Sequence, residues 1–198
     1  MMRLILAAAA ITLSAPVAAT AVVGQAAPGF TATDSSGRTV SLSDFRGKPV
    51  VLEWTNADCP FVQKWYSGGD MQKLQADARK QGAVWLTINS GAPGKQGHVD
   101  GQAANAKMRA QGFQSTAYLL DADGAIGRAY GARTTPHMFV IAPDGTLAYA
   151  GGIDSIPSAN PADIAKAEPL ARLAITQVAA GKPVGTPTSK PYGCSVKY

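Results

Sequence analysis

Cys59 is the residue of this chain best placed to do nucleophilic chemistry. It follows the apolar run 50–55, which is typical of a buried strand, and precedes Pro60, a residue favoured at the first position of a helix. Free N–H groups at such a helix start favour the thiolate by about 0.3 to 1 kcal/mol. The Asp58 carboxylate, about 6 Å from the sulfur, opposes the thiolate by roughly 0.7 kcal/mol in a water-like dielectric. The two effects nearly cancel.

Cys194 is the only other cysteine. Both cysteines lie in the part of the chain that we expect to be exported, because residues 1–21 have the layout of a secretory signal peptide. Arg3 precedes an apolar run over 4–13, and small residues follow. That run is shorter than the roughly 20 residues of a membrane-spanning helix. We therefore expect an exported protein of the bacterial periplasm, with no membrane span after cleavage, whose two thiols can pair in one disulfide.

The order of apolar runs and helical patterns predicts a three-layer α/β/α sandwich with a mixed sheet and an N-terminal β-hairpin. The domain should extend over 22–180, with a Pro- and Thr-rich tail over 181–198. We expect Gly68-Gly69 and Pro169 to interrupt helices. The expected elements are a hairpin at 31–45, strands at 50–55, 84–90, 115–120, 137–142 and 146–150, and helices at 60–81, 101–110 and 161–180.

Composition and charge exclude several classes of protein. Hydrophobic residues make up 46% of the chain and charged residues only 16%, which excludes wholesale disorder. The net charge is +5, but Lys and Arg are scattered singly, so the chain carries no footprint of nucleic-acid binding. Two cysteines are too few for an all-cysteine zinc site, and we expect no cofactor.

Several motifs resemble the AhpC/TSA redoxin family, in a peroxiredoxin-like branch of exported thioredoxin-fold proteins. They are the strand followed by Cys59-Pro60, the segment Thr134-Thr135-Pro136 before a later strand, and the terminal Gly-Cys-Ser-Val-Lys-Tyr at 193–198. The opening segment 24–30 and the turn at 143–145 fit as well. The resemblance implies a thioredoxin-like fold for nearly all of the chain that remains after export.

The resemblance also implies roles for residues around Cys59. The Thr135–Pro136 bond is expected to be cis and to present the Thr135 backbone to a bound peptide. Glu53, six positions before Cys59, corresponds to a buried carboxyl that carries protons for the sulfur. The alternative for Glu53 is a solvated position on an exposed strand face. Phe61 either packs in the core or lines a substrate groove beside the sulfur.

Two departures from the family concern the sulfur chemistry. The second cysteine of a thioredoxin pair would stand at position 62, where this chain has Val62, so no local disulfide can form. In peroxiredoxins the peroxide-reducing cysteine usually aligns with that same position, and a helpful threonine aligns with Cys59. Efficient peroxide reduction is therefore not expected.

The two histidines have less specific interpretations. His137 follows Pro136 and could act as a base for the thiol or as a metal ligand, although a structural residue at a strand start is the favoured interpretation. His98 lies in a Gly-rich stretch and is interpreted as a solvated loop residue.

The leading hypothesis is an exported thiol-disulfide oxidoreductase that uses Cys59 as the redox-active thiol and Cys194 as its distant partner, acting on protein or small-molecule thiols and disulfides. A second hypothesis makes the same pair a structural disulfide in a binding protein, since closing so long a loop stabilises by up to roughly 5 kcal/mol. The remaining hypotheses are a thiol peroxidase, and a copper-binding protein that uses Cys59 and His137, with Cys194 as a further candidate ligand.

Overall fold

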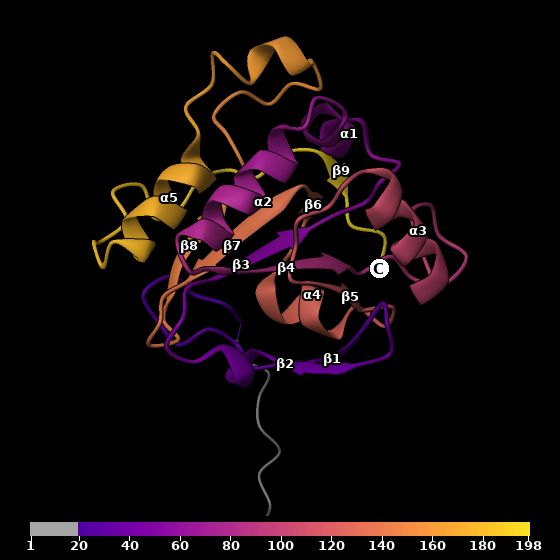
Figure 1. Ribbon diagram of the computed structural model, residues 1–198, viewed down its shortest axis with the longest axis horizontal. Coiled ribbons are helices and arrows are strands. Elements are labelled where there is room, and N and C mark those ends of the chain that lie inside the picture. Colours follow the sequence, from indigo (N-terminus) through magenta and orange to yellow (C-terminus); the bar gives the residue numbers. More distant parts are fainter. Residues whose placement is uncertain (1–19) are drawn as a thin grey trace, which may run out of the picture.

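The computed structural model describes residues 20–198, so the predicted signal peptide lies almost wholly outside the described residues. Seven strands in the described part of the chain form one mixed sheet in the order β2-β1-β5-β4-β3-β7-β8 (Figure 1). Their bounds are β1 Thr31–Asp34, β2 Thr39–Ser41, β3 Val50–Trp54, β4 Val84–Asn89, β5 Ala117–Leu120, β7 His137–Ile141 and β8 Leu147–Gly151. A separate pair joins β6 (Thr134–Thr135) to β9 (Cys194–Ser195).

Strands β3 and β4 form the centre of the sheet, because every residue in them is buried. Both run parallel to β5, whereas β7 runs antiparallel to β3. The register pairs Trp54, the last residue of β3, with His137, the first residue of β7. The segment around Pro136 therefore lies beside the segment that follows β3.

Helices cover both faces of the sheet, as Figure 1 shows. The helix bounds are α1 Pro60–Ser67, α2 Asp70–Lys80, α3 Gly101–Ala110, α4 Ala125–Tyr130 and α5 Leu170–Ala179. Helices α1, α2 and α5 share one hydrophobic core with the sheet residues Val51 and Trp85. Helix α4 packs on the opposite face, in a second core with Leu52 and Ile88. The expected three-layer α/β/α architecture with a mixed sheet is confirmed.

Glycine interrupts the expected helix over 60–81, because Gly69, with φ of 85°, precedes α2. Three local predictions were wrong. The expected helix over 161–180 is α-helical only after Pro169, because Pro161–Asp163 form a 3-10 turn and irregular turns follow up to α5. A 3-10 turn at Leu42–Phe45 shortens the second strand of the hairpin, and α4 was not expected. Helix α4 has six residues, too few to show a helical period in the sequence.

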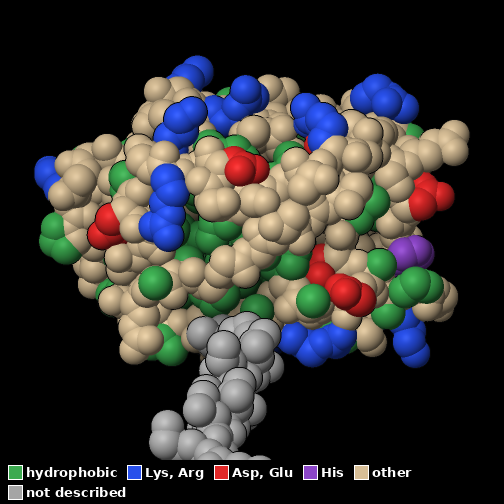
Figure 2. Space-filling model, turned by 90° about the horizontal axis from the view of Figure 1, so that it is seen from below, with side chains coloured by type: hydrophobic (Ala, Val, Ile, Leu, Met, Phe, Trp, Pro, Cys, Tyr) green, Lys and Arg blue, Asp and Glu red, His purple; other side chains and the backbone are tan. Residues whose placement is uncertain are grey.

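One face of the molecule carries its basic residues in a dispersed arrangement. Figure 2 shows Lys and Arg side chains spread over one face rather than gathered in a single patch, with Asp and Glu among them. None of the helices between residues 20 and 198 combines the length and the apolar character needed to cross a membrane.

Candidate active site

Cys59 lies at the end of the loop between β3 and α1, and it is the N-cap residue of α1. Its carbonyl accepts the first helical hydrogen bonds, from the N–H groups of Val62 and Gln63 at 2.9 Å each. Pro60 occupies the first helical position, where no N–H group is needed. The Cys59 side chain is enclosed in the core below α1, with 0% of the residue exposed. The helix start thus stands next to a sulfur that solvent does not reach.

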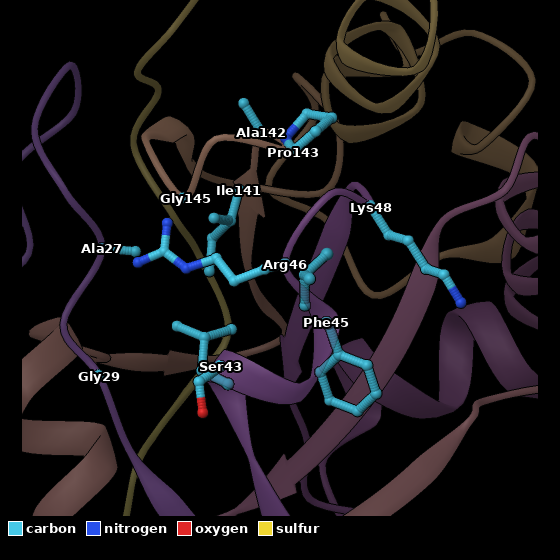
Figure 3. A pocket seen from close by; sticks show the side chains of 12 residues that line it. Ala27, Gly29, Ser43, Phe45, Arg46, Lys48, Ile141, Ala142, Pro143 and Gly145 are labelled. Carbon is cyan, nitrogen blue, oxygen red and sulfur yellow. The ribbon is translucent and has the colours of Figure 1, made fainter.

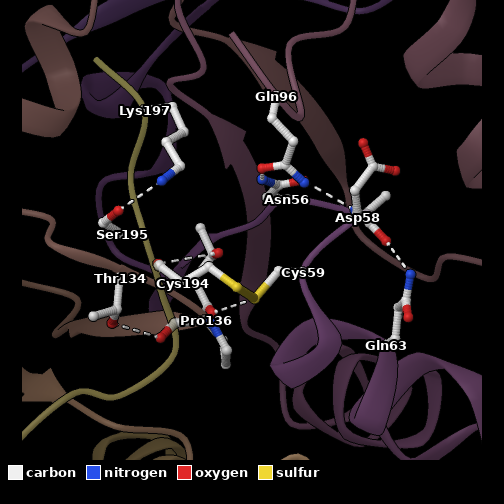
Figure 4. Close-up of a disulfide and its surroundings, with 12 residues drawn as sticks. Asn56, Asp58, Cys59, Gln63, Gln96, Thr134, Pro136, Cys194, Ser195 and Lys197 are labelled. Atoms are coloured by element: carbon white, nitrogen blue, oxygen red, sulfur yellow. Dashed lines mark hydrogen bonds between the residues drawn. A yellow bond between two sulfur atoms is a disulfide. The ribbon is translucent and has the colours of Figure 1, made fainter.

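A disulfide joins Cys59 to Cys194 across 135 residues of sequence, with 6.0 Å between the two Cα atoms (Figure 4). That separation lies within the range of unstrained disulfides. Strand β9 brings Cys194 to the site by pairing antiparallel with β6, in a register that sets Cys194 opposite Thr135. In contrast to Cys59, Cys194 is half-buried.

The Thr135–Pro136 peptide bond is cis, as the resemblance implied. The carbonyl oxygen of Thr135 lies 3.1 Å from Cys59 Sγ. That backbone was expected to face a bound peptide, and in this structure it pairs with the chain's own Cys194. The tail also covers Phe61, because the Tyr192 ring packs edge-on against the Phe61 ring with centroids 5.8 Å apart.

Glu53 is fully buried on the α1 and α2 side of the sheet, so the interpretation of a solvated residue was wrong. Its carboxylate accepts hydrogen bonds from four side chains of the described chain. They are Tyr66 at 2.8 Å, Trp85 at 2.9 Å, Thr87 at 3.1 Å and Gln75 at 3.2 Å. Burial raises the pKa of Glu53, and these four donors oppose that rise.

His137 is a buried structural residue at the start of β7, in agreement with the favoured interpretation. Its Nδ1 atom accepts the backbone N–H of Arg133 at 3.3 Å, and its ring packs on Phe139 with centroids 4.4 Å apart. Burial, together with the positive charge of Arg133, lowers the pKa of His137 to about 4. The imidazole is therefore neutral at neutral pH.

Acidification should destabilise the protein through His137. The unfolded imidazole binds a proton near pH 6.5 and the folded one only near pH 4, so the unfolded state holds more protons between these values. The free energy of unfolding should fall by about 3 kcal/mol from this group as the pH drops from about 7 to about 4. Urea unfolding of wild type and of His137→Gln at both pH values measures the effect.

The variant isolates His137 from Glu53, whose raised pKa acts in the opposite direction by making the folded state bind its proton more tightly. On acidification from about pH 7 to about pH 4, His137→Gln should lose less stability than wild type. Equal slopes for the two proteins would contradict the assignment.

Lys107, on α3, is a neighbour of the site that sequence reasoning missed. Its Nζ pairs with the Asp58 carboxylate at 3.1 Å, with both side chains partly exposed. The cation offsets the negative charge that the sequence places beside Cys59, so Asp58 opposes the thiolate less than its position in the chain suggests. Lys107 and Asp58 are 49 residues apart in the sequence, and no local sequence pattern predicts that they pair.

A buried ion pair under the tail was also missed. Lys64 on α1 and Asp154, in the loop after β8, lie 3.1 Å apart with side chains 0% and 1% exposed. The Tyr192 hydroxyl donates to the other Asp154 oxygen at 2.5 Å. The tail thus covers the buried charges of Lys64 and Asp154 and donates one hydrogen bond to the Asp154 carboxylate.

Metal-binding side chains do not gather in residues 20–198, where no group of three or more His, Cys, Asp and Glu could hold a metal ion. His98 is half-buried rather than solvated, and its Nδ1 lies 2.8 Å from the carbonyl of Gly91. A cavity of about 140 Å³ lies elsewhere, where β3 begins and β7 ends (Figure 3). Arg46 lines it and donates to the Asp144 carbonyl, so its guanidinium is already engaged.

Solved structures and a curated protein resemble this chain. A hypothetical protein of Sinorhizobium meliloti 1021 superposes with a TM-score of 0.75 at 26% identity, over 90% of this chain and 96% of that one. The thioredoxin domain of a thiol-disulfide oxidoreductase from Bacteroides vulgatus superposes with a TM-score of 0.53 at 18% identity, over 74% of this chain and 98% of that one. Thiol-disulfide oxidoreductase ResA of Geobacillus thermodenitrificans is 31% identical over 126 residues, which is 63% of this chain and 66% of ResA. The match thus spans slightly less than two thirds of the length of that relative.

The sheet order, the helix that begins at a cysteine and the cis-proline beside it define a thioredoxin-fold protein with a disulfide at the start of its first helix. The model of the AhpC/TSA family matches residues 23–150. The chain belongs to that family.

Proposed function

We propose that this protein is an exported thiol-disulfide oxidoreductase in which Cys59 and Cys194 alternate between a disulfide and two thiols. The observation that carries the proposal is the disulfide itself, which joins a helix N-terminus to a strand paired beside a cis-proline. The likeness to ResA, a protein named for this activity, supports it. The partners are protein or small-molecule thiols and disulfides, and the expected location is the periplasm.

The place of Cys59 at the start of α1 makes it the sulfur that joins the partner in the mixed disulfide. A partner thiolate attacks Cys59, once the tail that covers this enclosed sulfur moves aside, and releases Cys194 as a thiolate. A second partner thiol then attacks the partner sulfur of the mixed disulfide and releases Cys59 as a thiolate beside the free N–H groups of α1. Two partner thiols become a disulfide, the protein disulfide becomes two thiols, and two protons pass from the partner to the protein.

Glu53 enters this proposal as the proton carrier of the site. Its raised pKa lets a carboxyl group hold a proton closer to neutral pH. Tyr66, which donates to Glu53, belongs to α1, the helix that Cys59 caps. Thr135 and Pro136 would contact the substrate together with Phe61.

One observation favours a second function, a structural disulfide in a binding protein. The Cys59 sulfur is completely enclosed, and closing a loop of 135 residues stabilises by roughly 5 kcal/mol in the chain-entropy model. The reduction potential of the mature protein, measured against glutathione buffers, separates the two functions. A value of about −180 to −270 mV is expected for a working redox pair, and a value below about −300 mV would favour the structural disulfide.

Hydrogen peroxide should oxidise the reduced protein only at the rate of an ordinary thiol. A peroxidase places donors where charge develops as the O–O bond breaks. At the position of the expected peroxide-reducing cysteine this chain has Val62, which is buried. Stopped-flow mixing of reduced protein with peroxide, with free cysteine as the control, measures the rate. A rate constant several orders of magnitude above that of free cysteine would contradict the expectation and make peroxidase the leading function.

A further inference from the structure

The last seven residues, 192–198, lie across the site as an extended segment, here called the tail segment. Its central strand β9 pairs with β6 through only two residue pairs, Thr134 with Ser195 and Thr135 with Cys194. A ladder of this length is weak by itself. The covalent link that holds it is the disulfide to Cys59. Reduction therefore leaves the tail segment attached only by hydrogen bonds and side-chain contacts.

The position before Cys194 accepts only glycine. Gly193 has φ of 131°, and a Cβ atom built there would lie 2.1 Å from the carbonyl oxygen of Thr135. Any side chain at this position would collide with a buried backbone, which cannot yield as a flexible side chain would. The close approach of β9 to the cis-proline segment thus requires glycine directly before the cysteine.

Tyr192, two residues before Cys194, lies over the buried ion pair of Lys64 and Asp154. The Tyr192 ring contacts Phe61, and Lys64 Nζ lies 5.6 Å from the ring centroid. The Tyr192 hydroxyl donates to Asp154 at 2.5 Å. An apolar residue here would remove this donor and leave that oxygen of Asp154 with only the backbone N–H of Ile156, at 3.0 Å. The site therefore favours an aromatic residue that carries a hydroxyl group.

A second aromatic position lies four residues after Cys194. The Tyr198 ring lies under the Arg128 guanidinium at 4.9 Å, and its hydroxyl donates to the Ala132 carbonyl at 2.7 Å. Gly127 leaves the space for it, since a Cβ atom at this glycine would lie 2.4 Å from the Tyr198 hydroxyl. Ser195 lies between the two aromatic positions and is exposed, so its contacts do not restrict which side chain can stand there.

We propose that the tail segment is a tethered occupant of a peptide groove, and that the groove of the reduced protein takes an extended segment of a partner protein in its place. The partner segment carries a disulfide-bonded cysteine, a glycine directly before it, a tyrosine two positions before it and an aromatic residue four positions after it. This inference rests on the proposed oxidoreductase function and names its substrate class. Backbone pairing with β6 supplies affinity, and the two aromatic positions supply selectivity.

The chemistry balances in the reducing direction. The Cys59 thiolate attacks the partner cysteine in its disulfide, and the other sulfur of that disulfide leaves as a thiolate. Cys194 then attacks Cys59 in the mixed disulfide and releases the partner cysteine. The partner disulfide gains two electrons and becomes two thiols, while the two protein thiols lose their protons and two electrons and become the Cys59–Cys194 disulfide.

The test uses the reduced full-length protein with Cys194→Ser, which cannot complete the second step and so retains the peptide on Cys59. The probe is a peptide with the sequence of residues 191–198, its cysteine carrying a nitrothiobenzoate disulfide whose release is followed by absorbance. Peptides with Gly193→Ala, Tyr192→Phe and Tyr198→Ala are compared with a matched Ser195→Ala control. Mass spectrometry checks that the peptide is attached to Cys59.

We expect the Gly193→Ala peptide to react at least about tenfold more slowly than the parent, and each tyrosine variant several-fold more slowly, with Ser195→Ala unchanged. Equal rates for all peptides would overturn the inference. Exchange with a small aromatic disulfide together with equal peptide rates would leave the oxidoreductase function standing. Absence of exchange with every probe, the small disulfide included, would overturn the proposed function and this inference together.

Discussion

Replacing Cys59 by serine should lower the rate of thiol-disulfide exchange by the reduced protein at least about 1,000-fold, because a serine hydroxyl is not ionised at neutral pH and cannot form the mixed disulfide. Cys59 is the sulfur at the N-terminus of α1, where the free N–H groups favour its thiolate. The measurement is turnover of a small aromatic disulfide in the presence of a reductant.

Cys194→Ser is the matched control for this result. It keeps the Cys59 thiolate and should complete one half-reaction, releasing one equivalent of thiol and stopping at the mixed disulfide. A variant without Cys59 that releases one equivalent of thiol as fast as the variant without Cys194 would contradict the assignment of the two sulfurs. Loss of activity in both variants, with no single-equivalent burst from Cys194→Ser, would contradict it as well.

Replacing Lys64 by methionine should destabilise the oxidised protein by about 3 to 5 kcal/mol, because it leaves the Asp154 carboxylate buried without its cation. Both side chains of this pair are at most 1% exposed, so water cannot take the place of the lost partner. Lys64 Nζ also lies 5.8 Å from the ring centroid of Trp65 and 5.6 Å from that of Tyr192, and these contacts disappear too. Urea unfolding at neutral pH, with the disulfide intact, measures the change.

The surface pair of Lys166 with Asp163 provides the control. The Lys166 side chain is 67% exposed, and Lys166→Met should change the free energy of unfolding by less than about 1 kcal/mol. The double variant Lys64→Met with Asp154→Leu should recover most of the lost stability, since it removes both buried charges. A loss of under about 1 kcal/mol for Lys64→Met alone would show that the pair is not buried in solution.

Sequence patterns predicted the layers of the fold because local signals act within one element. The apolar run at 50–55 favours a central strand, and Gly69 and Pro169 mark the starts of helices whatever packs against them. The sequence pattern did not predict helix α4, because its six residues form less than two helical turns and show no clear period.

The sequence by itself determined which sulfur caps a helix, since Cys59 stands between an apolar run and Pro60. It also indicated that Thr135-Pro136 leads into a strand. The burial of Glu53 stayed open, because a carboxyl in a strand is solvated or buried according to what packs on that face. Only α1, α2 and the neighbouring strand, which contribute Tyr66, Gln75 and Trp85, decided it.

Only the tertiary structure decided what surrounds the disulfide. The pairing of β9 with β6 joins residues about 60 positions apart, and no period or motif encodes its register. The same holds for Lys64, Asp154 and Tyr192, which come from a helix, a loop and the tail and meet only when all three have packed. The physical reason is that local signals specify the conformation of one segment, whereas side chains distant in sequence meet through the packing of the whole chain.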